Sequence, residues 1–358
     1  MTRRLWANPI PVVRQGLLRR KRRWARRVLR SQAKGRILPE ANPPEAQPLE
    51  DFRFFAVLGT WMEEDIVEAT VRNAFAQGVE AVFLVDNAST DETVDRAMAA
   101  GATLAESFAT DAYEERVRIL LMNAVVARVS FSSGASHIWW LWLDADEFPE
   151  GPAGLTIADY LRRLDRRFRV VGSTYYNHLP TAKPEYIPGF HPIDFQPLCE
   201  QFTSDFVPRC AQPHWKHPLQ RFDREGPFVV SGAGFHTVSM RTRQPLYEPV
   251  GGIVTHHITY REESFTRSRM ELMCGGLARN AFNDAVGNRT IQRRFESLDA
   301  VYTQDWPRVN NLRGEEPNIG VRPRPWPDPK STRRWYDQHE LEAAKEKWLI
   351  DYSPTSSG

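Results

Sequence analysis

The chain has 358 residues, of which 41% are hydrophobic and 26% charged, a composition typical of a globular protein with a sizeable core. No apolar run is long enough to cross a membrane, and the first residues lack the apolar segment of a secretory signal. Cys199, Cys210 and Cys274 are too widely spaced for a disulfide framework or a zinc knuckle. We therefore expect a reducing, cytoplasmic setting.

The formal net charge of +2 conceals an uneven distribution. Residues 1–39 contain 13 Lys and Arg and no Asp or Glu, so the remainder has 34 basic residues against 45 acidic ones. Within residues 14–30, apolar side chains gather near one side of a helix surrounded by arginines, a pattern typical of binding to an anionic membrane surface or another polyanion. Such binding would make the protein peripheral at the inner face of the membrane. A disordered basic tail explains the composition equally well, and no specific nucleic acid is expected.

Composition also divides the chain. The predicted segments are a basic amphipathic or disordered arm at 1–38, a Pro-rich extended linker at 39–50, a folded domain at 51–275 with halves 51–151 and 152–275, and a helical or extended region at 276–358.

Strand and helix patterns alternate in the first half of the folded domain. The strand candidates are residues 52–61, 80–87, 102–108 and 137–143. Between them, apolar residues such as Val67, Val71 and Ala74 recur at helical spacing. Three pairs have the spacing of a helix capping box, namely Thr60 with Glu63, Ser89 with Glu92, and Asp111 with Glu114. Alternation with short connections predicts an α/β fold, with a mostly parallel sheet flanked by helices on both faces.

Polar residues follow three of the four predicted strands. They are Thr60 with Glu63 and Glu64, Asp86 with Asn87, and Asp144 with Asp146. In a parallel sheet, the ligand crevice lies at the carboxyl ends of the strands. A loop accounts for one such cluster, but three at one edge predict a binding site. Asp86 and Asn87 are placed to form hydrogen bonds with a base or a ribose.

The acidic cluster is densest in WWLWLDADEFPEG, residues 139–151, where an apolar strand leads into Asp144, Asp146, Glu147 and Glu150. Carboxylates so close together repel one another unless a cation or a proton relieves the repulsion. Asp144 and Asp146 point to the same side of an extended chain, so both can reach one Mg²⁺ or Mn²⁺, or one can bind it directly and the other through water. Phosphate oxygens and water would complete the shell. The alternative is that the acidic residues complement the dipole of a following helix. The absence of GxGxxG and P-loop sequences disfavours Rossmann dinucleotide binding and P-loop chemistry.

Two motifs carry a family resemblance. VDNASTDET, residues 85–93, and LWLDADEF, residues 141–148, together resemble family 2 glycosyltransferases of the GT-A fold, in the subgroup whose DxD metal motif reads DxDEF. The resemblance is close over about residues 52–151 and looser to about residue 275. It implies a GT-A sheet with a small antiparallel or irregular acceptor-side region.

The resemblance also implies substrates and a site. The donor would be a nucleoside diphosphate sugar, a UDP-sugar first, and the acceptor a saccharide, a lipid or a protein. The implied nucleotide-sugar site comprises Thr60, Glu63, Asp86, Asn87 and Asp144, and Asp144 and Asp146 would hold Mn²⁺ or Mg²⁺. Met62 stands where many relatives have Asn, so that contact is not expected here.

Two histidines are the main candidates for a third metal ligand. Several GT-A enzymes take one from a downstream histidine, and the spacing of His257 and Arg261 resembles a segment of the same subgroup. His236 follows an apolar strand and competes for the role, with His256 behind both. Histidines in strands are, however, more often packed and hydrogen-bonded than bound to metal.

Other residues of the second half have less defined roles. Lys216, Arg221 and Arg261 could neutralise a diphosphate or form ordinary salt bridges. The catalytic base is open between Asp194, Asp205 and Asp223. Near the C-terminus, residues 332–350 read as a charged helix whose Trp335, Leu341 and Trp348 dock on the body or on a partner.

The sequence as a whole therefore favours a metal-dependent glycosyltransferase of the hexosyltransferase type, which moves a sugar to an acceptor hydroxyl, with inversion by the family resemblance. A sugar-phosphate nucleotidyltransferase is the enzymatic alternative, since it also places a metal at strand ends of a similar sheet. A non-catalytic polyanion- or membrane-binding module on a relic GT-A fold is the third hypothesis.

Overall fold

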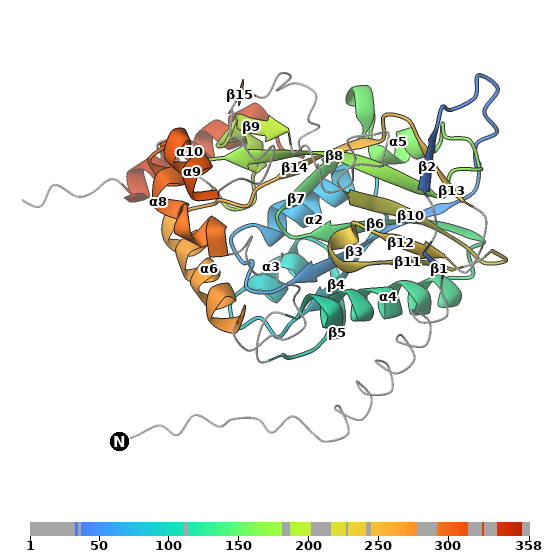
Figure 1. Cartoon of the computed structure of the whole chain (residues 1–358), viewed down its shortest axis with the longest axis horizontal. Helices are drawn as coiled ribbons and strands as arrows, with labels where there is room; N and C mark the ends of the chain where they lie inside the picture. Colours follow the sequence, from blue (N-terminus) through green and yellow to red (C-terminus); the bar gives the residue numbers. More distant parts are fainter. Residues whose placement is uncertain are drawn as a thin grey trace, which may run out of the picture.

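The computed structural model describes residues 33–34, 37–110, 114–180, 187–201, 216–226, 228–240, 245–277, 292–313, 324–325 and 335–352 (Figure 1). The basic segment 14–30, Asp111, Asp205 and Cys210 lie outside these residues. Within them, no helix combines the length and apolar character needed to span a membrane.

The first half of the central sheet is parallel. Its strands are β3 (Arg53–Thr60), β4 (Ala81–Asp86), β5 (Thr103–Ser107) and β6 (His137–Asp144). They lie in the order β6-β3-β4-β5, and each neighbouring pair is parallel. These are the four strands that the sequence pattern predicts.

The second half of the sheet is largely antiparallel. β10 (Lys216–Asp223) lies between β6 and β8 (Val170–Leu179) and runs antiparallel to both. The edge beyond β8 comprises β9 (Leu198–Gln201) and β15 (Arg324–Pro325). β14 (Ile253–His257) pairs in parallel with β8 and antiparallel with β7 (Glu147–Glu150). This arrangement confirms the predicted α/β class and is consistent with a GT-A fold.

Alternating side chains of the central strands enter two separate cores. Phe54, Ala56 and Leu58 of β3 lie in one core, whereas Phe55 and Val57 lie in the other. The first core is covered by α2 (Val67–Ala76), α3 (Thr93–Ala99) and α5 (Ile157–Leu161), and the second by α4 (Glu115–Ser132), which runs along the sheet in Figure 1. Because side chains of a strand alternate between its faces, this division explains why β3 is apolar almost throughout.

The predicted capping boxes at Thr60 and Ser89 are wrong, and the third rests on Asp111, which lies outside the described residues. Thr60 is the last residue of β3, and α2 begins only at Val67. Neither α2, α3 nor α4 has a side-chain hydrogen bond at its N-cap. The polar side chains of these connections instead bond one another across the strand ends, which competes with capping.

The N-terminal side of the body begins before residue 51. β2 (Ile37–Glu40) pairs in parallel with β13 (Leu246–Pro249), and the Gln47 backbone N–H donates to Asp165 (3.0 Å). β1 (Ala33–Lys34) joins β12 (Val238–Met240) and β11 (Val229–Ser231) in a small sheet. Part of the segment predicted as an extended linker therefore lies on the body, because its backbone polar groups find partners there.

The C-terminal helices gather at one end of the molecule (Figure 1). They are α6 (Glu263–Leu277), α8 (Leu298–Tyr302), α9 (Trp306–Arg313) and α10 (Gln338–Tyr352). Trp335 Nε1 donates to the Gly189 carbonyl oxygen (3.1 Å), and Leu341 is buried in the first core. Docking of these two side chains on the body is confirmed, whereas the Trp348 side chain lies outside the described ones.

Candidate active site

The acidic motif forms a strand, a turn and a second strand. β6 ends at Asp144, β7 begins at Glu147, and Asp146 lies in the turn between them. The Ile258 backbone N–H donates to the Asp146 carbonyl oxygen (2.8 Å), which holds the turn against the end of β14. No helix follows Asp144 directly, so the helix-dipole interpretation of these carboxylates is wrong.

Two basic side chains hold Asp144. Arg118 Nη1 donates to Asp144 Oδ1 (2.6 Å), and Lys216 Nζ donates to Oδ2 (2.7 Å). Burial alone would raise the pKa of Asp144, but the charges of Arg118 and Lys216 lower it well below its ordinary value. The repulsion expected from the sequence is thus relieved here by cations of the protein itself.

Lys216 also contacts Glu147, which is almost fully buried. The lysine donates to Glu147 Oε1, and the Tyr175 hydroxyl donates to Oε2 (3.0 Å). Burial raises the pKa of Glu147 to about 8. Burial alone would lower the pKa of Lys216, but the charges of Asp144 and Glu147 outweigh it and raise the lysine pKa. One ammonium group between two carboxylates leaves Asp144 ionised and favours a proton on Glu147 at neutral pH.

Asp146 lies beside His257. His257 Nε2 is 3.5 Å from Asp146 Oδ2, although Asp146 lies in the β6–β7 turn and His257 ends β14, far away in the sequence. Burial alone would raise the pKa of Asp146, but the charges of His257, Arg269 and Arg261 hold it below its ordinary value. The register of β14 against β7, which sets His257 opposite Glu147, accounts for this proximity.

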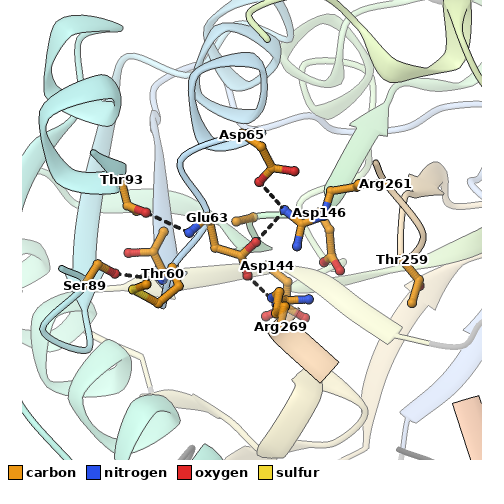
Figure 2. Close-up of polar contacts among 12 residues, drawn as sticks. Thr60, Glu63, Asp65, Ser89, Thr93, Asp144, Asp146, Thr259, Arg261 and Arg269 are labelled. Atoms are coloured by element: carbon orange, nitrogen blue, oxygen red, sulfur yellow. Dashed lines mark hydrogen bonds and ion pairs between the residues drawn. The ribbon is translucent and has the colours of Figure 1, made fainter. Parts of the chain in front are cut away.

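A buried ion-pair cluster adjoins Asp146 (Figure 2). Arg261 is fully buried, and its Nη1 atom lies 2.7 Å from Glu63 Oε2 and 2.7 Å from Asp65 Oδ1. Arg269, from α6, donates to the other oxygen of Glu63. Burial raises the pKa of Asp65 to about 6, even though Arg261 acts in the opposite direction. The cluster joins the β3–α2 connection to the segment that follows β14.

Thr60, Asp86 and Asn87 also meet at the sheet edge. Asp86 Oδ1 accepts from Thr60 Oγ1 (2.9 Å) and Ser89 Oγ (2.7 Å), and Oδ2 accepts from the Ser89 backbone N–H (2.9 Å). Asn87 Nδ2 donates to Thr110 Oγ1 (3.0 Å). These contacts fix the ends of β3 and β4 and give Asp86 and Asn87 partners within the protein.

Met62 has an unusual backbone conformation in the same connection. Its φ is 56°, its N–H donates to Ser89 Oγ (2.9 Å), and its Sδ accepts from the Thr90 backbone N–H (3.4 Å). A positive φ is uncommon for a residue other than glycine and is often found at functional sites. Met62 therefore shapes the connection that carries Glu63 and Asp65.

Two other predicted residues lie at the opposite edge of the sheet. Asp223 faces His137 at the beginning of β6, and Arg221 Nε donates to Asp223 Oδ1 (2.8 Å). Asp144 ends the same strand seven residues later, so the two edges are roughly 23 Å apart. Arg221 and Asp223 are thus not brought to the acidic motif.

The remaining candidates have different surroundings. Asp194 accepts a hydrogen bond from the Tyr336 hydroxyl. His256 is fully buried and points to the other side of β14 from His257. Its Nδ1 atom lies 2.8 Å from His178 Nε2. His236 is exposed at the end of a 3-10 turn, next to Phe235, whose ring faces Lys216. Of the three histidines, the geometry favours His257 as the partner of Asp146.

Three residues of the site were not predicted from the sequence, namely Arg118, Asp65 and Arg269. Arg118 lies within a helix whose apolar spacing indicates core packing, and its reach to Asp144 spans 26 positions. Asp65 and Arg269 carried no motif. Their only signal in the sequence is the spacing of charged residues, and that spacing does not distinguish a residue of the site from a surface residue.

A divalent cation fits part of this donor set. Among the described residues, no group of three or more His, Cys, Asp and Glu is arranged to hold a metal ion. Asp146 and His257 nevertheless offer one carboxylate and one imidazole, which suit Mn²⁺ or Mg²⁺ when phosphate oxygens and water complete the shell. Both oxygens of Asp144 are engaged by Arg118 and Lys216, so in this arrangement it is not free to be a direct ligand.

No protein-family model matches the chain, and no curated protein does. Solved structures give weak likenesses. A glucosyl-3-phosphoglycerate synthase from Mycobacterium tuberculosis, in complex with Mn²⁺, UDP and phosphoglyceric acid, is 14% identical with a TM-score of 0.32, over 65% of this chain and 80% of that one. A mycobacterial protein is 13% identical with a TM-score of 0.32, over 79% of this chain and 83% of that one.

Proposed function

We propose that the chain is a metal-dependent glycosyltransferase that moves a sugar from a nucleoside diphosphate sugar, a UDP-sugar first, to an acceptor hydroxyl. The observation that carries the proposal is the 3.5 Å approach of Asp146 and His257, in the DxDEF motif and the downstream histidine segment, at the carboxyl ends of a parallel sheet. The family resemblance of the sequence favours inversion.

Asp146 and His257 would hold a Mn²⁺ or Mg²⁺ ion. When bound, such an ion stabilises the negative charge that develops on a departing diphosphate. The protein cations beside it serve the same charge: Arg261 lies next to Asp146, and Lys216 and Arg118 lie at Asp144. Of the three cations considered from the sequence, Lys216 and Arg261 are near enough to act and Arg221 is not.

The chain positions the other groups through fixed contacts. Lys216 and Arg118 keep Asp144 ionised and fixed at the end of β6, where it can accept a hydrogen bond from a donor hydroxyl once one of its cations is displaced. Asp86, held by Thr60 and Ser89, sets the turn that would lie against the base. The proton of the acceptor hydroxyl would pass to a carboxylate in the second half of the chain.

The test measures metal and nucleotide binding together. Titration calorimetry of UDP with Mn²⁺ is expected to show tight binding for the native chain and a loss of about 10–100-fold for Asp146→Ala and for His257→Ala. His236→Ala is the matched control and is expected to bind as the native chain does. Full Mn²⁺-dependent UDP binding in both Asp146→Ala and His257→Ala would refute the site.

Thermal shift with UDP, GDP and TDP sugars, with and without Mn²⁺, would identify the nucleotide because ligands of the native state raise the melting temperature. Product analysis separates the enzymatic alternatives: release of a nucleoside diphosphate supports glycosyl transfer, and release of pyrophosphate supports nucleotidyl transfer. A variant lacking residues 1–32 tests the binding-module hypothesis, because it keeps the strands that pack on the body. Sugar-nucleotide turnover by this variant would reject that hypothesis.

A further inference from the structure

Only one of the three nitrogen atoms of the Arg261 guanidinium group has partners among the described residues. Its Nη1 atom contacts both Glu63 and Asp65 at 2.7 Å. Its Nε and Nη2 atoms are buried and have no hydrogen-bond partner among the described residues. A buried N–H without a partner is costly, and two such atoms on one edge of an arginine call for a physical explanation.

The unpartnered edge has a defined chemistry. Nε and Nη2 form the side-on fork of a guanidinium group, whose two parallel N–H donors match two oxygens of one phosphate or carboxylate. Arg261 and Asp146 belong to the same buried cluster at the sheet edge (Figure 2). An anion bound there would therefore sit next to the proposed metal position.

The other surroundings fix the direction of the fork. Arg261 Cζ lies over the Phe265 ring, 5.0 Å from its centroid. The Arg261 backbone is held as well, because its N–H donates to Thr266 Oγ1 (2.9 Å) and its carbonyl oxygen accepts from the Tyr302 hydroxyl (2.8 Å). With the backbone fixed and Nη1 bound to two carboxylates, the Nε–Nη2 edge has little freedom to turn.

We propose that Asp65 and Glu63 are positioning residues that hold Arg261 by Nη1, so that its Nε–Nη2 edge receives a phosphoryl group of the donor diphosphate. This inference rests on the proposed function. It assigns Asp65 a role that no sequence motif indicated, and it changes the role of Glu63 from a contact with the donor to a support of the residue that makes that contact.

The closing experiment uses inorganic pyrophosphate with Mg²⁺, so that recognition of the base does not enter. By calorimetry, Arg261→Lys is expected to weaken pyrophosphate binding about 10–100-fold, because an ammonium group cannot form the fork. Asp65→Asn and Glu63→Gln are expected to weaken it about 3–30-fold, since each leaves one neutral partner at Nη1. Glu68→Gln is the matched control, because Glu68 pairs with Arg72 at the surface of α2. This variant should bind pyrophosphate like the native chain.

Two further measurements keep the inference separate from folding and from the proposed function. Thermal unfolding identifies a variant that has lost its fold, and Asp65→Glu, which restores a carboxylate, should recover part of the binding in a folded protein. If Asp146→Ala abolishes Mg²⁺-dependent binding but Asp65→Asn and Glu63→Gln bind normally, the inference is wrong and the proposed function stands. If Asp146→Ala and His257→Ala both bind pyrophosphate with Mg²⁺ normally, the proposed function itself is contradicted.

Discussion

Gly59 lies opposite Asp144 on the neighbouring strand, and the space beside its Cα lets the Arg118 guanidinium cross β3 to the Asp144 carboxylate. A Cβ atom at Gly59 would lie 2.6 Å from Arg118 Nη1 and 3.0 Å from Met122 Sδ. Gly59 therefore has two roles: it belongs to β3, and its missing side chain leaves the space that Arg118 occupies.

Gly59→Ala is expected to displace Arg118 from Asp144. Loss of one charge-assisted hydrogen bond should reduce kcat/KM about tenfold, and the overpacking should cost about 1–3 kcal/mol in the free energy of unfolding. Steady-state kinetics and urea unfolding measure the two effects. In an Arg118→Ala background, the same glycine change should reduce kcat/KM no further, and an additional tenfold loss there would contradict a route through Arg118.

Lys216→Met should destabilise the fold by about 3–5 kcal/mol, because it removes the buried cation that holds the ionised Asp144 and donates to the buried Glu147 carboxyl group. Adding Glu147→Gln to that variant replaces the buried carboxyl group, which has lost its cation, by an amide that carries no charge at any pH, and should recover part of the loss. Urea unfolding of both variants gives the comparison. A double variant no more stable than Lys216→Met would mean that Glu147 does not depend on the lysine.

The stability of the fold should decline in mild acid through His178. This side chain is fully buried, its Nδ1 lies 2.5 Å from the Gln196 carbonyl oxygen, and its Nε2 faces His256. Burial lowers its pKa from 6.5 to about 3, so between these values the unfolded chain binds more protons than the folded one. The stabilisation from neutral His178 is complete above pH 6.5 and falls as the pH drops towards 3, by at most about 1.4 kcal/mol per pH unit.

Urea unfolding at pH 7 and pH 5 measures this dependence. His178→Gln cannot take up the proton and should show a smaller difference between the two pH values than the native chain. An equal difference in both proteins would assign the acid sensitivity to other groups.

Trp335→Ala should weaken the attachment of the C-terminal helix to the body. The change removes the hydrogen bond to Gly189 and the ring that packs 5.5 Å from His191, at a cost of about 2–4 kcal/mol in the free energy of unfolding. Trp335→Phe keeps an aromatic ring and loses only the N–H, so it should cost about 1 kcal/mol. Equal losses in the two variants would show that the hydrogen bond, and not the ring, attaches the segment.

The parallel half of the sheet was predictable because its signals are local. Apolar runs of strand length alternate with helical spacing, and the observed strands begin and end within a residue or two of the predicted ones. The capping boxes failed for the opposite reason. Thr60 and Ser89 have the right spacing for a cap, but both hydroxyl groups donate to Asp86 at the end of β4.

Most partners of the site could not be read from the sequence, because they depend on long-range register. His257 and His256 are adjacent in the sequence, and only the alternation of β14 turns one towards Asp146 and the other towards His178. Lys216 was left open between a diphosphate contact and an ordinary salt bridge. The sequence could not show that it joins Asp144 to Glu147, because this depends on β10 running antiparallel beside β6 and beginning where β6 ends.

The antiparallel insertion of β10 has a consequence for biosynthesis. A ribosome completes the acidic end of β6 well before it reaches Lys216, which lies 72 positions later. Until then, the nascent chain carries Asp144 and Glu147 without the ammonium group that later joins them, so the centre of the sheet can close only after residue 216 has emerged. Truncated products that stop earlier should therefore remain open to proteases even though all four parallel strands are present.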